Sequence, residues 1–143
     1  MGSASDADRM KPAVETLEKF EISAEIIVMS AHRSPKQVAE FAEDAKERGF
    51  SVIICGAGMA AHLAGAVAAN TTLPVIGVPL SGSAMSGLDS LLSTAQMPKG
   101  IPVATVAIDG SMNAALLAVQ ILALGNSNLS ELLVSHRKEM SSR

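Results

Sequence analysis

A histidine and an arginine stand side by side in residues 30–35, directly after an apolar run. An imidazole can move a proton near neutral pH, whereas a guanidinium keeps its charge and binds phosphate through two hydrogen bonds. His32 is therefore a candidate acid/base and Arg33 a candidate phosphate anchor. The residues alone leave an alternative open, in which His32 satisfies backbone carbonyls and Arg33 is a solvated surface charge.

The first residues of the chain also carry polar groups suited to a ligand. Gly2 permits close backbone approach, Ser3 and Ser5 offer two hydroxyls, and Asp6 offers a carboxylate at the start of an expected helix. This set suits a phosphate and the ribose hydroxyls attached to it, although the segment lacks the Gly-Lys-Ser/Thr of a Walker loop. The alternative is a Ser/Asp helix cap with no ligand.

A third candidate loop, residues 56–62, begins with small residues. Because no large side chain stands in the way around Gly58, its backbone can approach a planar ligand or a small gas, and a CO2 pocket is conceivable. Close packing of a helix on a strand explains the same glycines and alanines. His62 is then a buried, hydrogen-bonded ring.

The elements that must position these loops follow from the hydrophobic pattern. Short, almost continuously apolar runs occur at 24–29, 51–55, 74–78 and 102–107, and each is followed by a loop and an Ala-rich helical pattern. This alternation predicts an α/β sandwich with a parallel sheet covered on both faces. Such sheets bind ligands beyond the carboxyl ends of their strands, where the three loops fall.

Helix ends are also readable. Asp6 or Ser5 is available as a first N-cap, and a second helix is expected to begin at Pro35 after Ser34 and to end before Gly49. Four more helical patterns are predicted over 58–70, 88–96, 113–124 and 129–140.

The start of the chain is unusual for this fold class. Residues 1–6 look like the loop between a first strand and its helix, but no strand precedes them. Since the first strand is central in doubly wound sheets, we expect N-terminal residues to be missing and the sheet to have a gap in its middle. The alternative is that Met1 is the true start and another segment fills that place.

Length and composition restrict the class of protein. The 143 residues suit one domain over 1–143, and apolar stretches are interrupted well before a membrane-spanning length. A net charge of -3 gives no basic surface for nucleic acid. The single cysteine, Cys55, lies in an apolar run, and the given sequence starts with no basic and apolar leader pattern, so we expect a soluble, cytoplasmic protein.

Five segments follow one another in a fixed order and spacing: Met-Gly-Ser-Ala-Ser-Asp (1–6), Ser-Ala-His-Arg-Ser-Pro (30–35), Gly-Ala-Gly-Met-Ala-Ala-His-Leu (56–63), Gly-Leu-Asp-Ser-Leu-Leu-Ser (87–93) and Gln-Met-Pro-Lys-Gly-Ile-Pro-Val (96–103). Together they carry a resemblance, over nearly the whole chain, to a known family, the class I N5-carboxyaminoimidazole ribonucleotide mutases (PurE family). It implies a flavodoxin-like three-layer α/β/α sandwich, a homo-octamer, and neither metal nor organic cofactor. The implied reaction moves a carboxylate from the exocyclic nitrogen of an aminoimidazole ribonucleotide to the neighbouring ring carbon.

The resemblance also implies roles for individual residues. His32 corresponds to the proton carrier and Arg33 to the phosphate anchor, while Ser3 and Asp6 correspond to ligands of the phosphoribosyl group. Residues 88–93 and 96–100 are expected to shape the site from the same or an adjacent subunit. Supporting site positions are Ser5, Ser30, Gly58 and His62.

Two positions depart from the family pattern. Met59 stands where the family usually has Gly, and Ala64 where Pro is common; both are expected beside the CO2 pocket. Two other functions stay open: a carboxylase of the same fold that uses free CO2, and a non-catalytic nucleotide-binding or flavodoxin-like module. Arg33 after the histidine favours the class I mutase, because the class II enzymes generally have Lys there.

Overall fold

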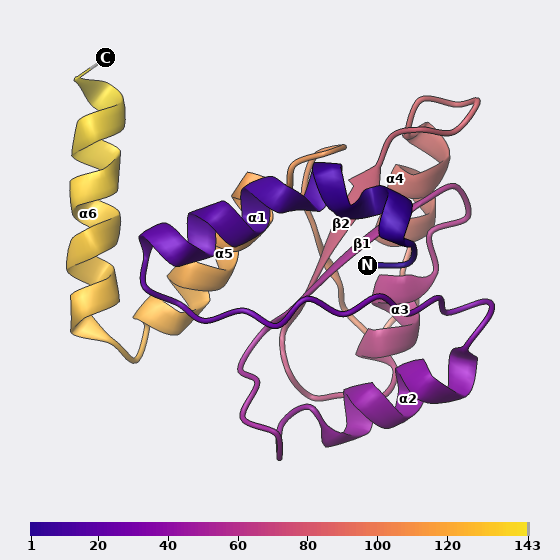
Figure 1. Ribbon diagram of the computed structural model, residues 1–143. Coiled ribbons are helices and arrows are strands. Elements are labelled where there is room, and N and C mark those ends of the chain that lie inside the picture. Colours follow the sequence, from indigo (N-terminus) through magenta and orange to yellow (C-terminus); the bar gives the residue numbers. More distant parts are fainter. Residues whose placement is uncertain (143) are drawn as a thin grey trace.

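The computed structural model describes residues 1–142 and has a parallel sheet with helices on both faces (Figure 1). The elements, in chain order, are η1 (Ala4–Asp6), α1 (Ala7–Lys19), α2 (Pro35–Asp44), β1 (Ile53–Gly58), α3 (Leu63–Ala68), β2 (Val75–Leu80), α4 (Leu88–Ala95), β3 (Ala104–Thr105), α5 (Ser111–Ala123) and α6 (Ser127–Ser141). The predicted three-layer α/β/α sandwich with a parallel sheet is confirmed.

The sheet has the strand order β1-β2-β3. β1 pairs with β2 along its whole length, from Ile53 opposite Val75 to Gly58 opposite Leu80. β3 pairs with β2 at two positions only. All six residues of β2 are buried, as expected for an apolar strand covered on both faces.

Helices α2, α3 and α4 cover one face of the sheet. Val38 and Ala42 of α2 and the buried residues of α3 pack with Ile53 and Cys55 of β1. At Gly77 of β2, a Cβ atom would overlap the side chain of Thr94 in α4. The missing side chain therefore lets α4 lie close to the sheet.

Helices α1 and α5 cover the other face, with α6 outside them (Figure 1). Ile76, Val78 and Leu80 of β2 pack against Ala114 and Ala118 of α5. A second cluster joins α1, α5 and Leu129 of α6. Strand β2 is thus covered by a layer of helices on each face of the sheet.

Two strand predictions need correction. Residues 24–29 were expected to form a strand but have no regular secondary structure. A strand is defined by its backbone ladder, and within the described residues this segment's backbone bonds run to Met1 alone, at Ile27 and Met29. The strand expected over 102–107 shrinks to Ala104–Thr105, at the edge of the sheet.

Two helix predictions also need correction. The helix expected over 58–70 begins only at Leu63, because Gly58 is the last residue of β1 and Met59 has a left-handed φ of 58°. Helix α2 ends at Asp44, and a turn follows up to Gly49. The other four helices agree with the predicted ranges to within two residues. No helix among residues 1–142 combines the length and the apolar character needed to cross a membrane.

Candidate active site

The three candidate loops meet at the carboxyl end of β1. Gly2 donates its N–H to the carbonyl of Gly56 at 3.1 Å, and Met29 donates to the carbonyl of Met1 at 3.0 Å. The guanidinium of Arg33 reaches the carbonyl of Gly2 at 3.4 Å. These contacts bring residues 2–6, 30–35 and 56–62 to one edge of the sheet, as the strand-end rule predicts.

His32 and His62 face each other across this edge. Their ring centroids lie 5.2 Å apart, with the ring planes inclined at 40°. Both residues are exposed, and within residues 1–142 neither imidazole makes a protein hydrogen bond. The alternatives in which His32 satisfies backbone carbonyls and His62 is a buried ring are therefore wrong. Two imidazoles with free nitrogen atoms remain available to a ligand.

Ser30 shapes the turn that carries His32 and Arg33. Its hydroxyl oxygen accepts a hydrogen bond from the backbone N–H of Arg33 at 3.2 Å, and its carbonyl accepts from Ser34 N–H at 2.8 Å. Ser34 precedes α2 without a side-chain cap bond, and Pro35 opens the helix as predicted. The side chain of Ser30 thus stabilises this turn through a hydrogen bond inside it.

Ser3, Ser5 and Asp6 form a compact hydrogen-bonded group. The Ser3 hydroxyl oxygen accepts from the Ser5 N–H and from the Ser5 hydroxyl, at 3.3 and 2.9 Å. Asp6 Oδ2 accepts from the Ser3 N–H at 3.1 Å, which completes a capping box around η1. Ser3 is thus the N-cap of η1. Asp6, one of the two predicted N-cap residues, is the N-cap of α1, although its side chain makes no cap hydrogen bond there.

Gly58 and Met59 turn the chain at the end of β1. A Cβ atom at Gly58 would lie 3.4 Å from the carbonyl oxygen of Leu80, an ordinary contact distance. Met59 is 66% exposed and lies on the loop. Ala64, in contrast, is a buried residue of α3, and its methyl group packs on the sheet. The departure from the family pattern at Ala64 is therefore a matter of core packing.

A polar group that the sequence reasoning missed lies at the carboxyl end of β2. Ser81 donates its backbone N–H to Asp109 Oδ1 at 2.9 Å and its hydroxyl to Asp109 Oδ2 at 2.5 Å. Arg9 of α1 approaches both, with its Nε 3.3 Å from Ser81 Oγ and 3.6 Å from Asp109 Oδ1. Ser81 could have been identified as a candidate from the sequence, since it directly follows a strand. Arg9 and Asp109 come from elements remote in sequence.

Helix α4 is tied to the end of β2 through Ser90, and it also presents exposed apolar residues. The buried Ser90 hydroxyl donates to the carbonyl of Leu80, which ties α4 to the end of β2. Leu88 and Leu92 are 47% and 49% exposed. This part of the predicted 88–93 segment therefore lies beside the strand ends with apolar side chains facing outward.

Cys55 takes no part in this arrangement. It is buried, and burial raises the pKa of its thiol to about 12. A thiol that stays protonated is a poor nucleophile and a poor metal ligand. Within the described residues, no group of three or more His, Cys, Asp or Glu side chains is placed to hold a metal ion.

The chain is similar to known proteins over almost its full length. Residues 1–143 match the family described as AIR carboxylase. An N5-carboxyaminoimidazole ribonucleotide mutase from Pyrococcus abyssi is 56% identical over 98% of this chain and 80% of its own length. A chloroplastic phosphoribosylaminoimidazole carboxylase from Vigna aconitifolia is 54% identical over 90% of this chain and 23% of its own length.

The fold is similar to that of a solved member of the PurE family. The crystal structure of Treponema denticola PurE superposes with a TM-score of 0.87 and 26% identity, covering 99% of this chain and 89% of the other. The expected flavodoxin-like fold is thereby confirmed. These matches also confirm the resemblance drawn from the five sequence motifs: the chain belongs to the AIR carboxylase family.

Proposed function

We propose that this chain is an N5-carboxyaminoimidazole ribonucleotide mutase, an isomerase of purine biosynthesis. It converts N5-carboxyaminoimidazole ribonucleotide into 4-carboxy-5-aminoimidazole ribonucleotide. The observation that carries the proposal is the meeting of His32, His62 and the Arg33 guanidinium with the 2–6 loop at the carboxyl edge of the sheet. The high identity to a mutase of this name supports the substrate.

His32 carries the proton in the proposed mechanism. In its protonated form it donates a proton to the exocyclic nitrogen, so that the bond from this nitrogen to the carboxylate breaks and leaves a neutral aminoimidazole and CO2. The ring carbon then attacks CO2, and the now neutral His32 removes the proton from that carbon. One proton is given and one is taken, so the imidazole ends as it began.

Two features of the loops support the proton-carrier role. The imidazole of His32 has no protein hydrogen-bond partner within residues 1–142, so both ring nitrogens are free for substrate. The turn is fixed by the Ser30 hydroxyl rather than by the imidazole. His62 lies 5.2 Å away between ring centroids, close enough to contact the same small ligand.

Arg33 and the 2–6 loop bind the phosphoribosyl group in this proposal. The Arg33 guanidinium is exposed and spans the gap to Gly2, beside the hydroxyls of Ser3 and Ser5 and the carboxylate of Asp6. Phosphate bound remote from the reacting carbon supplies orientation. Gly58 gives the aminoimidazole ring room at the end of β1.

The assembly and the location are part of the same proposal. Large apolar side chains are exposed on α4 and α6, among them Leu92 at 49%, Val134 at 52% and Met140 at 61%. Exposed apolar groups of this kind are usual at contacts between subunits, which supports the proposed homo-octamer with sites near those contacts. The buried free thiol of Cys55 supports a reducing, cytoplasmic location.

The family description and the plant relative's name favour one second function, a carboxylase that adds free CO2 to aminoimidazole ribonucleotide. The test supplies N5-carboxyaminoimidazole ribonucleotide in labelled bicarbonate and follows label into the product. A trapped-CO2 mutase gives unlabelled product. Rapid turnover of aminoimidazole ribonucleotide with labelled bicarbonate, and none of the carboxylated substrate, would establish the carboxylase instead.

A further inference from the structure

Arg9 lies on the helix that directly follows the loop of residues 2–6. The turn η1 ends at Asp6 and α1 starts at the next residue, so the chain is helical without a gap from Ala4 to Lys19. Arg9 therefore stands in the first turn of α1, three residues after Asp6. Because residues three apart on a helix are neighbours, a contact that holds Arg9 also holds the end of the helix that carries this loop.

The side chain of Arg9 reaches the ends of two other strands. Its Nε lies 3.3 Å from the hydroxyl oxygen of Ser81 and 3.6 Å from Oδ1 of Asp109. Ser81 directly follows β2, and Asp109 lies between β3 and α5. The guanidinium also lies against Gly82, where a Cβ atom would come within 3.2 Å of Nη2. The glycine thus leaves room for the guanidinium at the end of β2.

The hydroxyl of Ser81 is fully used within this group. It donates its single proton to Oδ2 of Asp109 at 2.5 Å and accepts from Nε of Arg9. Oδ1 of Asp109 accepts in addition from the backbone N–H of Ser81 at 2.9 Å. The bonds run in one direction, from guanidinium through hydroxyl to carboxylate, and the charges at both ends strengthen them. Ser81 and Asp109 therefore serve to hold Arg9.

Asp109 is itself fixed by its backbone. Its φ of 55° is left-handed, a conformation that Asp adopts more readily than most residues. Its N–H donates to the carbonyl of Pro79 at 2.8 Å, and its carbonyl accepts from the N–H of Ser111 at 2.9 Å. The buried hydroxyl of Ser111 donates in turn to the carbonyl of Arg9 at 2.7 Å. Arg9 is thus attached to the segment after β3 through both its side chain and its backbone.

The loop of residues 2–6 lies between an attachment at Gly2 and one at Arg9. The N–H of Gly2 donates to the carbonyl of Gly56 in β1 at 3.1 Å, whereas Arg9 joins the segments that follow β2 and β3. Between the two attachments lie the polar residues of the proposed phosphoribosyl site, which hydrogen-bond to one another: Ser3, Ser5 and Asp6. Their mutual bonds set the shape of the loop, and the attachments set where it lies relative to the strand ends.

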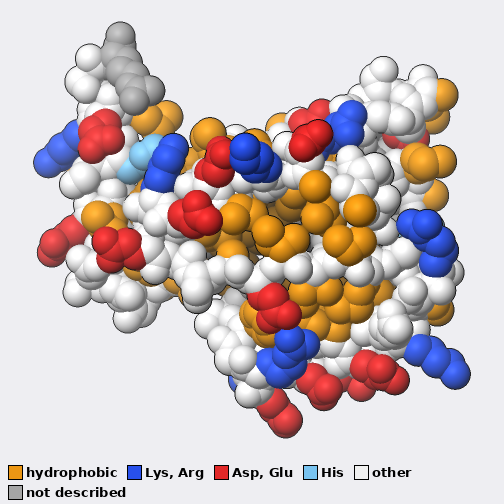
Figure 2. All heavy atoms as spheres, in the orientation of Figure 1, with side chains coloured by type: hydrophobic (Ala, Val, Ile, Leu, Met, Phe, Trp, Pro, Cys, Tyr) orange, Lys and Arg blue, Asp and Glu red, His pale blue; other side chains and the backbone are white. Residues whose placement is uncertain are grey.

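The contact of Arg9 differs from a surface ion pair of the same helix. Figure 2 shows acidic and basic side chains mixed along the exposed side of α1. Lys11 and Glu15 form a pair of this kind, 3.4 Å apart, with side chains that are 71% and 53% exposed. Such pairs contribute little, because water and salt screen them. The partners of Arg9 instead lie at the strand ends, remote in the sequence.

We propose that Arg9 is a positioning residue of the phosphoribosyl site and that it acts through Ser81 and Asp109. It holds the amino end of α1 against the ends of β2 and β3, so that the polar groups of the 2–6 loop stay aligned with Arg33. Because this loop binds remote from the reacting carbon, the loss of Arg9 weakens binding more than it slows the chemical step. The inference rests on the proposed function of this site.

The first test replaces Arg9 by an apolar side chain of similar length, in Arg9→Met. Calorimetry measures the Kd of aminoimidazole ribonucleotide, and steady-state kinetics with N5-carboxyaminoimidazole ribonucleotide gives KM and kcat. Kd and KM are expected to rise by about 3- to 10-fold, while kcat changes by less than about twofold. Lys11→Met, which removes the exposed pair of the same helix, is the matched control and is expected to change neither Kd nor KM. An unchanged Kd in Arg9→Met overturns the proposal.

A second variant tests whether Arg9 acts through Asp109. Asp109→Asn keeps a residue that tolerates the left-handed backbone, but it removes the charge and the acceptor of the Ser81 hydroxyl proton. Its Kd is expected to rise in the same direction, and the double variant is expected to bind no more weakly than Arg9→Met, since both changes break one chain of bonds. Additive effects, or an effect of Arg9→Met alone, would mean that Arg9 contacts the ligand itself. A lower Tm with an unchanged Kd would mean a purely structural contact. Each of these results overturns the proposal.

The two readouts separate this inference from the proposed reaction. If the unmodified chain binds aminoimidazole ribonucleotide but has no mutase turnover, the reaction is wrong, and the Kd values still decide the case of Arg9. If turnover is present and the variants keep the same Kd, only the inference on Arg9 is wrong. A chain that does not bind the ribonucleotide overturns both. If Arg9→Met does not fold, Asp109→Asn decides alone: a raised Kd supports the proposal, and an unchanged Kd overturns it.

Discussion

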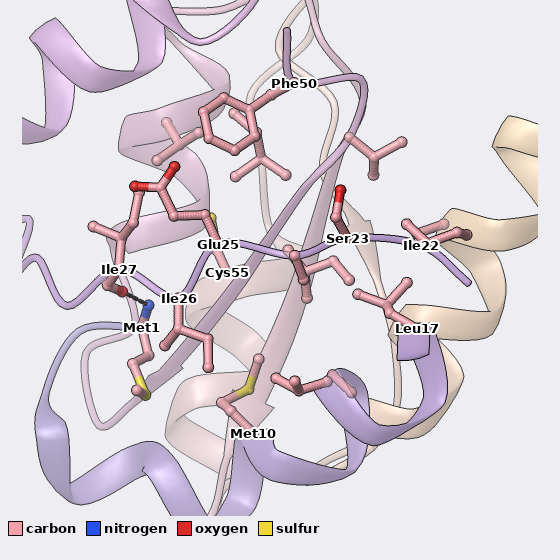
Figure 3. Close-up of a pocket in the computed structure, with 18 of the residues that line it drawn as sticks. Met1, Met10, Leu17, Ile22, Ser23, Glu25, Ile26, Ile27, Phe50 and Cys55 are labelled. Atoms are coloured by element: carbon pink, nitrogen blue, oxygen red, sulfur yellow. Dashed lines mark hydrogen bonds between the residues drawn. The ribbon is translucent and has the colours of Figure 1, made fainter. Parts of the chain in front are cut away.

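The candidate active site and an open groove meet at the first two residues. Gly2 contacts the candidate loops, and Met1 lines the groove, a cavity of about 1040 Å3 between residues 22–27 and β1 (Figure 3). On the side of the loops, polar groups converge: Arg33 contacts Gly2, and His32 faces His62. On the side of the groove, apolar walls and backbone groups face empty space. Met1 and Gly2 join the candidate loops through a few backbone hydrogen bonds, although the space beside them is open.

The largest effect is expected at the candidate active site, the first of the two regions compared. His32→Asn removes the proposed proton carrier but keeps a polar side chain of similar size, so kcat is expected to fall by about 10²–10⁴-fold with ribonucleotide binding retained. Steady-state kinetics and calorimetric titration measure the two quantities. His136→Asn, the same change on the remote helix α6, is expected to leave kcat unchanged. A fully active His32→Asn enzyme would contradict the mechanism and favour the non-catalytic module.

The next largest effect compares the closed core with the open groove. Ile76 is fully buried in β2, whereas Ile26 on the groove wall is 61% exposed. Ile76→Ala is therefore expected to lower the free energy of unfolding by about 2–5 kcal/mol, through lost burial and a cavity. Ile26→Ala is expected to cost less than about 1 kcal/mol. Denaturant titration gives both values, and equal losses would show that the groove wall is already packed.

Arg33→Ala tests the proposed phosphate anchor beside His32. Loss of a charge-assisted phosphate contact of about 1.5–3 kcal/mol corresponds to a rise in KM of roughly 10- to 150-fold, with a smaller change in kcat. Arg137→Ala on the exposed side of α6 is the matched control and is expected to be neutral. If kcat falls as steeply as it does in His32→Asn while KM stays constant, the division of labour between the two residues is wrong.

Ser3→Ala tests the loop of residues 2–6, which lies between the candidate active site and the groove. The Ser3 hydroxyl accepts from the backbone of Ser5 in the capping box, so its loss is expected to cost about 1 kcal/mol of folding free energy. Ser5→Ala keeps both capping-box bonds and is expected to cost less. Thermal unfolding of the two variants measures the difference. The reverse order would mean that Ser3 is not the effective cap.

The smallest effect concerns the charge at the mouth of the groove. Burial lowers the pKa of the Met1 ammonium from 8.0. Between the lowered pKa and 8.0 the unfolded chain binds more protons, so this group makes stability rise with pH across that window. Below the window the full cost of the buried charge is present. An N-terminally acetylated chain is expected to lack this part of the pH dependence in otherwise identical denaturant titrations, and an unchanged slope would show that the ammonium is solvated.

The sequence predicted which loops form the candidate site. His32, Arg33 and the 2–6 segment were identified by residue type and by their position after apolar runs, and the structure places them together. Their partners were harder to predict. Arg9 and Asp109 meet at Ser81 from segments a hundred residues apart, and neither carries a local signal of that contact.

The fold was predictable where local pattern and tertiary context agree. Helix α1 has apolar residues at helical spacing, and strand β2 is a continuous apolar run; neither pattern needs a distant partner to be recognised. The segment 24–29 has an equally apolar pattern but forms no strand, because a ladder depends on a neighbour. The helix expected from Gly58 starts late for a similar reason, since pairing with Leu80 extends β1 through that glycine.

The sequence by itself determined the α/β class, the catalytic candidates and the family, because these depend on residue types in a fixed order. Only the tertiary structure decided that His32 and His62 face each other, that Ala64 belongs to the core, and that a groove separates 22–27 from β1. Those features depend on which backbone groups pair across space. Pairing depends on two segments, and the hydrophobic pattern of one segment does not identify its partner.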